Sequence, residues 1–179
     1  MPDFLVKFPP VVRRTKFTGA FKGSQHGEPN HCLVNEYEPG QGIMPHEDGD
    51  AYFPAVATIS LGSHTLLDIY RYASEDKAES ESKGRAREQD PRFSILQERR
   101  SLLVTRGAAY KAFLHGIAER RQDTQEHLSK VINADRIKDA ELKSALNGSS
   151  LERQKRLSLT LRDVERVSKG LAGLLGRRP

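Results

Sequence analysis

Cysteine is nearly missing from this chain of 179 residues, in which Cys32 is the only one. A single thiol excludes an internal disulfide framework, and it excludes a zinc site that needs several thiolates from one chain. Proteins without disulfides are typical of reducing compartments. We therefore expect the protein in the cytosol and the nucleus.

Long hydrophobic runs are missing as well. No stretch approaches the roughly 18 consecutive apolar residues that a membrane-spanning helix needs, and the N-terminus lacks the charged and then apolar layout of a secretory signal. Apolar residues make up 36% of the chain and charged residues 30%, which is polar but leaves aliphatic segments for a core. The length favours one domain, and we expect a monomer that makes no membrane contact.

Acidic residues are outnumbered, 24 to 29, and the net charge of +5 lies wholly in residues 151–179. That segment holds eight basic and three acidic residues, whereas residues 1–150 hold 21 of each sign. A basic segment can attract a polyanion, so nucleic acid is a candidate partner. The segment lacks the aromatic residues that stack on single strands, so a solvated end that keeps the chain soluble is the alternative.

Short aliphatic and β-branched segments separated by turn signals predict many strands. The expected strands span residues 31–37, 43–48, 55–61, 65–70, 92–96, 101–105 and 156–167. The Gly62-Ser63-His64 turn predicts a hairpin between the strands 55–61 and 65–70. Many short strands and few helices favour a mainly β fold, either a β-sandwich or a jelly roll.

The segments around these strands divide the chain. We expect one domain over residues 31–170, preceded by an irregular segment 1–30 and followed by a basic tail 171–179. Residues 73–91 are rich in charge and have no aliphatic side chain larger than alanine, which predicts a mobile loop. Residues 118–150 have helical spacing but few apolar positions, which predicts a partly ordered inserted helix or helix pair.

His46 and Asp48 are the first candidate metal ligands. On a strand, residues two apart point to the same face, so an imidazole and a carboxylate can meet one ion. A third ligand must come from elsewhere; His115 follows the apolar stretch 112–114 at a strand end, and His64 in a turn is the second choice. Two histidines and one carboxylate suit non-haem Fe(II) oxygen chemistry. A turn histidine beside a solvated aspartate is the alternative.

The segment 156–162 alternates leucines with polar residues. The polar face consists of Arg156, Ser158, Thr160 and Arg162. Arginine guanidinium groups bind carboxylates through two parallel hydrogen bonds, so this face predicts a groove for an acid. Asn35 and Tyr37 form a similar pair two residues apart that could orient a small acid. An edge strand with a solvated face is the alternative.

Taken in order, the patterns Asn-x-Tyr, His-x-Asp, a distal His and Arg-x5-Arg resemble the AlkB-like Fe(II)- and 2-oxoglutarate-dependent dioxygenases. The similarity is greatest to the subfamily of the sixth AlkB homologue, and it covers residues 31–72, 92–118 and 154–168. The resemblance implies a double-stranded β-helix (jelly roll) with a small helical insertion.

The resemblance also implies roles for the metal-binding candidates. His46, Asp48 and His115 would be the catalytic residues that bind Fe(II), so that His115 is preferred over His64. O₂ would be the co-reactant, and 2-oxoglutarate would be decarboxylated to succinate. Oxidation of an N-methyl group on a nucleobase would then release formaldehyde.

The cosubstrate residues follow from the same resemblance. Asn35 and Tyr37 would contact 2-oxoglutarate, and Arg156 would pair with its distal carboxylate. Arg162 would lie near the end that binds the metal, and Ser158 would line the same strand.

Fewer residues indicate the substrate than indicate the metal and the cosubstrate. Asp50 occupies the place where repair members hold the edge of a base, and a solvated turn residue beside Gly49 is the alternative. Only 34 residues precede Asn35, so residues 1–30 are expected to be a remnant of the family's lid over the nucleobase. The long span between His115 and Arg156 is expected to affect only the surface.

We therefore expect oxidative demethylation of an N-alkylated nucleobase in DNA or RNA. One alternative is a lid-truncated, catalytically weak form that binds the cofactors. The other is a dioxygenase that acts on protein.

Overall fold

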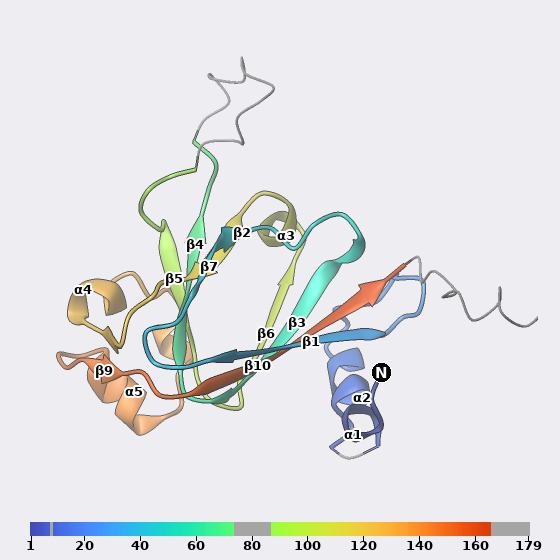
Figure 1. Ribbon diagram of the computed structural model, residues 1–179, viewed down its shortest axis with the longest axis horizontal. Helices are drawn as coiled ribbons and strands as arrows, with labels where there is room; N and C mark the ends of the chain where they lie inside the picture. The colour runs from blue at the N-terminus through green and yellow to red at the C-terminus, as the bar shows by residue number, and fades with distance from the viewer. Residues whose placement is uncertain (8, 74–86, 166–179) are drawn as a thin grey trace, which may run out of the picture.

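Two antiparallel sheets dominate the computed structural model, which describes residues 1–7, 9–73 and 87–165 (Figure 1). The first sheet has the strand order β1-β10-β3-β6, and the second has the order β2-β7-β4-β5. Strands that follow one another along the chain mostly lie in different sheets. Two four-stranded sheets linked by such crossings form a jelly roll, so the predicted fold class is confirmed.

The elements are short. The first sheet consists of β1 (His31–Tyr37), β10 (Arg156–Val164), β3 (Tyr52–Gly62) and β6 (Leu102–Arg106). The second sheet consists of β2 (Ile43–His46), β7 (Leu114–Ile117), β4 (Thr65–Tyr70) and β5 (Phe93–Gln97). A small separate pair is β8 (Gln122–Asp123) and β9 (Leu151–Glu152). The helices are α1 (Asp3–Val6), α2 (Val11–Lys16), α3 (Ala108–Lys111), α4 (Gln125–Leu128), a 3₁₀ turn (Ala134–Arg136) and α5 (Ala140–Ala145). Every strand expected from the sequence has a counterpart here.

The turn at Gly62-Ser63-His64 connects the two sheets, so the predicted hairpin is wrong. β3 pairs with β10 and β6, whereas β4 pairs with β5 and β7. Gly62 has a φ of 80°, and a Cβ atom there would lie 2.5 Å from the carbonyl oxygen of Lys155. Glycine therefore allows β10 to approach closely at the point where the chain leaves the first sheet.

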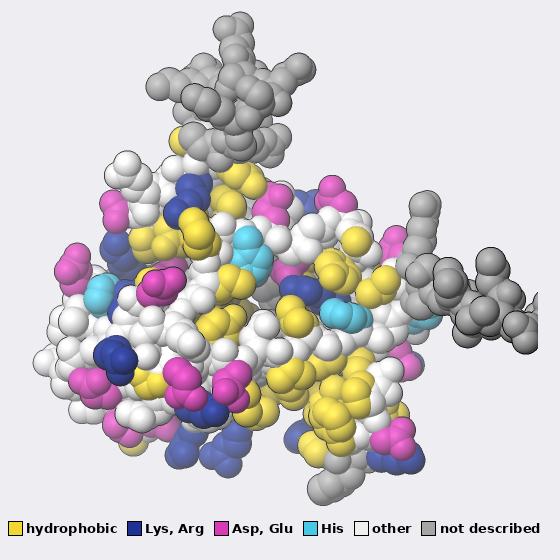
Figure 2. Space-filling model, in the orientation of Figure 1, with side chains coloured by type: hydrophobic (Ala, Val, Ile, Leu, Met, Phe, Trp, Pro, Cys, Tyr) yellow, Lys and Arg dark blue, Asp and Glu magenta, His cyan; other side chains and the backbone are white. Residues whose placement is uncertain are grey.

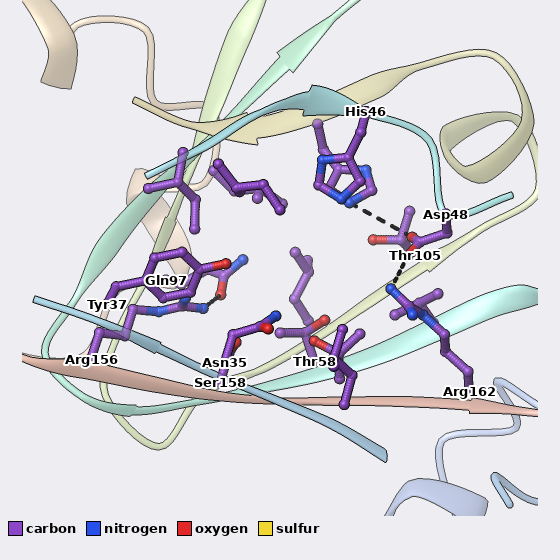
Figure 3. A pocket seen from close by; sticks show the side chains of 18 residues that line it. Asn35, Tyr37, His46, Asp48, Thr58, Gln97, Thr105, Arg156, Ser158 and Arg162 are labelled. Atoms are coloured by element: carbon purple, nitrogen blue, oxygen red, sulfur yellow. Dashed lines mark hydrogen bonds and ion pairs between the residues drawn. The ribbon is translucent and has the colours of Figure 1, made fainter. Parts of the chain in front are cut away.

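β10 is the strand that joins the core to the cavity. It pairs with β1 on one side and β3 on the other. Its leucines face outward, and Leu161 is fully buried in a hydrophobic cluster. Arg156, Ser158 and Arg162 point to the opposite face, between the sheets (Figure 3). The alternation in the sequence thus fixed which face of this strand is polar.

The segment before β1 contains two short helices followed by turns and bends over residues 17–28, so it is not irregular throughout. Leu5 and Phe21 are buried in one cluster with Ala57 and Leu161. The helices α1 and α2 therefore cover the outer face of the first sheet (Figure 1). Burial of these apolar side chains, worth about 1.5–3 kcal/mol for each large one, is what orders the segment.

The inserted segment 118–150 forms a second core, so the expectation that it affects only the surface is wrong. Leu128 and Leu142 are buried with Leu66 of β4 and Leu96 of β5. The short helices α4 and α5 are thus packed onto the outer face of the second sheet. Leu128 of α4 and both Leu142 and Ala145 of α5 supply the buried side chains of these two short helices.

Two sequence predictions fall mostly outside the described residues. Residues 74–86 contain most of the predicted mobile loop, and residues 166–179 contain the predicted basic tail. Within the described ranges, no helix is long and apolar enough to cross a membrane.

Candidate functional site

A cavity lies between the two sheets and opens on the face drawn in Figure 2, where the surface is hollowed between hydrophobic side chains. All candidate metal and cosubstrate residues line it: Asn35, Tyr37, His46, Asp48, His115, Arg156, Ser158 and Arg162. None of the described residues before His31 lines it. The N-terminal helices therefore support the sheet from outside and do not close over the cavity.

His46 and His115 face each other at one end of the cavity. They are register partners across β2 and β7, and their ring centroids are 4.5 Å apart. The Nδ1 atom of His46 lies 2.8 Å from the carbonyl oxygen of Met44. A carbonyl only accepts, so Nδ1 carries the proton and Nε2 keeps its lone pair for a metal.

Asp48 reaches the same place from a loop. β2 ends at His46, so the predicted strand 43–48 is too long, and Asp48 does not share a strand face with His46. One carboxylate oxygen lies 3.7 Å from Nε2 of His115, and the other accepts a hydrogen bond from Arg162. The Asp48 side chain is only 4% exposed, so the pair with Arg162 compensates its buried charge.

The surroundings of His115 keep its imidazole neutral. Burial lowers the pKa of His115, the nearby Asp48 carboxylate raises it, and His46 and Arg162 lower it again. The net shift is downward from 6.5. A neutral imidazole is the form that binds a metal.

The residues at this end fit an Fe(II) ion in donor type and location. Two imidazoles and one carboxylate leave coordination positions open for other ligands. Within the residues that the structure describes, no three His, Cys, Asp or Glu side chains are already spaced to hold a metal. One oxygen of the Asp48 carboxylate pairs with Arg162, and the other lies 3.7 Å from Nε2 of His115.

Arg156 is buried at the other end of the cavity, as the sequence predicts for an inward-facing guanidinium. Its Nε donates to Ser60 Oγ at 2.8 Å, and its Nη2 donates to Gln97 Oε1 at 3.0 Å. The Tyr37 ring lies 5.6 Å from the guanidinium carbon. Burial lowers the pKa of Arg156 to about 10, while Tyr37 raises it and Arg153 lowers it. The group is therefore a cation at neutral pH.

Two guanidinium nitrogen atoms of the site have no hydrogen-bond partner among the described residues. Among the described residues, Arg156 Nη1 and Arg162 Nε are buried without a hydrogen bond. Both belong to β10 and line the cavity. Buried guanidinium N–H groups without partners are costly, so a small molecule with carboxylates fits the cavity.

Asn35 and Ser158 lie between the two ends, and Tyr37 lies at the Arg156 end (Figure 3). Asn35 pairs with Ser158 in the register of β1 and β10, and Tyr37 pairs with Arg156. Burial raises the pKa of Tyr37, and Arg156 lowers it by a smaller amount. The phenol therefore keeps its proton and can donate a hydrogen bond.

Sequence reasoning missed Gln97 and Ser60, the two acceptors for Arg156. The predicted strand 92–96 ended one residue short of Gln97. Ser60 lies in the predicted strand 55–61, but its role depends on the pairing of β3 with β10, in which Ser60 is opposite Ser158. Strand alternation alone could have placed Gln97 on one face with Phe93 and Ile95. It could not have shown that Gln97 contacts Arg156.

Asp50 does not line this cavity. It borders a neighbouring pocket together with Tyr52, Tyr110 and three further charged residues, Glu47, Lys111 and Glu165. The Tyr110 hydroxyl donates to the carbonyl oxygen of Gly49 at 2.6 Å, which fixes the loop between Asp48 and Asp50. Burial raises the pKa of Tyr110 to about 12, with a further contribution from Asp48, so its hydroxyl remains a donor.

His64, the second choice for a metal ligand, lies in a different cluster. Its Nε2 is 3.2 Å from a carboxylate oxygen of Asp123, and its side chain is 8% exposed. Asp123 also accepts two hydrogen bonds from Arg153. Burial alone would raise the pKa of Asp123, but the hydrogen bonds from His64 and Arg153 hold it at about 2. His64 is therefore part of a buried ionic network outside the cavity.

Comparisons with known proteins point to one family. The model of the 2OG-Fe(II) oxygenase superfamily matches residues 4–162. A protein of Danio rerio named "Probable RNA/DNA demethylase ALKBH6" is 38% identical over 168 residues, which covers 93% of this chain and 64% of that protein. A protein of Macaca fascicularis named "tRNA (carboxymethyluridine(34)-5-O)-methyltransferase ALKBH8" is 32% identical, over 60% of this chain and 15% of its own length.

Two further matches have lower sequence identity. The uncharacterized protein L905 of Acanthamoeba polyphaga mimivirus is 29% identical, over 76% of this chain and 49% of its own length. The solved structure of OsALKBH1 superposes with a TM-score of 0.46 and 17% identity, over 91% of this chain and 64% of that one. This chain thus spans less than two thirds of the length of these relatives.

Proposed function

The chain belongs to the 2OG-Fe(II) oxygenase superfamily, and on this premise we propose that it is an Fe(II)- and 2-oxoglutarate-dependent dioxygenase that demethylates an N-alkylated nucleobase in DNA or RNA. The observation that supports the proposal best is the cavity itself, with two histidines and a carboxylate at one end and a buried, partly unpartnered guanidinium at the other. The similarity to a protein named a probable RNA/DNA demethylase supports the substrate class.

In this proposal His46, His115 and Asp48 hold the Fe(II). The iron, when bound together with 2-oxoglutarate and O₂, supplies the oxidising power for hydroxylation of a C–H bond. The neutral imidazole of His115 and the proton on Nδ1 of His46 leave nitrogen lone pairs available for the ion. Arg162 donates a hydrogen bond to the Asp48 carboxylate and would keep it ionised and oriented toward the ion.

The cosubstrate is held by β1 and β10. Arg156 pairs with the distal carboxylate of 2-oxoglutarate through Nη1, which has no hydrogen-bond partner among the described residues. The protonated phenol of Tyr37 donates to the same carboxylate, and Asn35 and Ser158 orient the chain of the acid. Arg162 lies toward the metal end, where the other carboxylate binds.

The neighbouring pocket is the proposed place of the substrate. Asp50 borders it next to the Asp48 loop, beside the rings of Tyr52 and Tyr110. An acidic group and two aromatic rings suit a planar base that carries positive charge when it is alkylated.

A cofactor-binding form with weak activity is a second candidate. It is favoured by one observation: the described residues before His31 lie on the outer face of the first sheet and do not cover the cavity. Such a form would bind 2-oxoglutarate and convert it slowly without a methylated substrate. A protein substrate remains the outcome to consider if nucleic acids are not demethylated.

Two measurements test the proposal. Calorimetric titration of 2-oxoglutarate in the presence of Mn²⁺, which takes similar oxygen and nitrogen ligands, should show binding that is lost in His46→Ala. Incubation with Fe(II), 2-oxoglutarate and single-stranded DNA or RNA carrying N-methylated bases should release formaldehyde. Succinate without formaldehyde would favour the cofactor-binding form, and no binding of 2-oxoglutarate would contradict both.

We further propose that the protein is located in the cytosol and the nucleus. We also propose that its basic C-terminal segment contacts nucleic acid. These proposals rest on the single cysteine and on the charge of residues 151–179.

A further inference from the structure

Gln97 links the two sheets at the carboxylate end of the cavity. It is the last residue of β5, in the second sheet, and it is only 3% exposed. Its Oε1 accepts a hydrogen bond from Nη2 of Arg156, which belongs to the first sheet, at 3.0 Å. Figure 3 shows the Gln97 amide next to the Arg156 guanidinium and the Tyr37 ring. A residue of the second sheet thus holds one end of a guanidinium that belongs to the first sheet.

Among the described residues, the groups that Arg156 contacts are neutral. Its contacts are the Ser60 hydroxyl, the Gln97 amide oxygen and the Tyr37 ring. The other buried arginines of the described chain are paired with carboxylates, Arg153 with Asp123 and Arg162 with Asp48. Two neutral acceptors therefore fix the guanidinium without neutralising it, and Nη1 is left for a ligand.

The position of Gln97 is itself held from both sides. The side chain of Asn133 bonds both the N–H and the carbonyl of Leu96, at 2.9 Å each. The Glu98 carboxylate accepts from the backbone N–H groups of Lys138 and Asp139. The inserted segment thus clamps β5 immediately before and after Gln97.

We propose that Gln97 is a positioning residue that orients the Arg156 guanidinium and so makes the cavity selective for an oxo acid with a second, distal carboxylate. This inference rests on the proposed function and deepens it. A neutral acceptor is required because a carboxylate at position 97 would form an ion pair with Arg156 and take the place of the ligand's own carboxylate. An apolar side chain would leave Nη2 without a partner and the guanidinium without a fixed direction.

The test compares two ligands that differ only at the distal end, 2-oxoglutarate and 2-oxovalerate, which has a methyl group there. Affinities are measured by calorimetry with Mn²⁺ present for the wild type, Gln97→Glu and Gln97→Leu. The matched control is Gln25→Glu, which makes the same isosteric change at an exposed residue outside the cavity. A thermal melt of each variant checks the fold.

Gln97→Glu should weaken 2-oxoglutarate binding about 100-fold and Gln97→Leu about 10-fold, while neither changes the affinity for 2-oxovalerate. Gln25→Glu should leave both affinities unchanged. A merely structural role would weaken both ligands equally, and that result would overturn the proposal. So would an unchanged affinity of Gln97→Glu for 2-oxoglutarate. If Gln97→Glu does not fold, the same comparison is made with Gln97→Leu: the proposal requires that its affinity for 2-oxoglutarate falls relative to its affinity for 2-oxovalerate. A wild-type protein that binds no 2-oxoglutarate would instead refute the proposed function, and this inference with it.

Discussion

Arg153 and Arg156 are three residues apart and both buried, yet their surroundings are opposite. Arg153 donates two hydrogen bonds to the Asp123 carboxylate and one to the carbonyl oxygen of Ala118. Arg156 contacts only neutral groups, and its Nη1 has no partner in the described part of the chain. The first guanidinium is compensated within the protein, and the second is not.

The difference distinguishes a buried arginine that stabilises the fold from a buried arginine that is available to bind a ligand. A buried cation is stable when a carboxylate and further acceptors satisfy it, as at Arg153. The protein leaves Arg156 with an uncompensated charge facing a cavity, at a cost to its own stability. That cost is recovered when an anion binds, so the two arginines should respond to substitution in opposite ways.

Asp123→Ala should have the largest effect and should act on stability alone. Removal of this carboxylate leaves Arg153 buried without its anion, which costs about 3–5 kcal/mol of unfolding free energy. The affinity of the folded protein for 2-oxoglutarate should not change, because Asp123 does not line the cavity. Urea denaturation and calorimetry measure the two effects. A loss below about 1 kcal/mol would show that the network contributes no more than a surface pair.

Arg156→Ala should produce the reverse pattern. The affinity for 2-oxoglutarate should fall about 100-fold or more, because the distal carboxylate loses its cation. The melting temperature should be kept or raised, since an uncompensated buried charge is removed. Arg14→Ala, at an exposed position of α2, is the control and should change neither. Equal effects of the two variants on the affinity would contradict the assignment of Arg156.

Acid should destabilise the compensated cluster. The folded-state pKa of Asp123 is about 2, below the ordinary value of 3.8, so the unfolded chain binds a proton at a higher pH than the folded chain. The contribution of Asp123 to stability, about 2 kcal/mol, is therefore present above about pH 4 and lost as the pH falls toward about 2. Urea denaturation over this range measures it. Asp123→Asn should flatten this slope and Arg156→Ala should not.

The smallest effect concerns basic residues outside the cavity. If nucleic acid binds the C-terminal segment, each phosphate contact adds about 0.9 to the salt slope for duplex or about 0.7 for single strands. Deletion of residues 169–179 removes Lys169, Arg177 and Arg178 and should flatten the slope in an anisotropy titration. Arg156 and Arg162 should add little, because they face the cavity. Binding that is insensitive to salt would favour a protein substrate.

At the metal end of the cavity, the predicted residues come together although one step of the sequence argument was wrong. His46, Asp48 and His115 do come together, but Asp48 comes from a loop and not from the strand face of His46. The shared position of the two histidines depends on the pairing of β2 with β7, which connects residues 69 positions apart. The resemblance to a family indicated that His115 joins His46 at the metal; the spacing of residues did not.

The sequence by itself determined seven of the strands and the two faces of β10, because side chains alternate with a period of two wherever a strand is half buried. It also determined that the guanidinium groups of Arg156 and Arg162 share a face. Only the tertiary structure decided that Gly62-Ser63-His64 crosses between sheets, that residues 1–30 and 118–150 form the outer layers, and that Gln97 meets Arg156. These are contacts between segments distant in the chain, and a local pattern specifies a face without specifying the partner that packs against it.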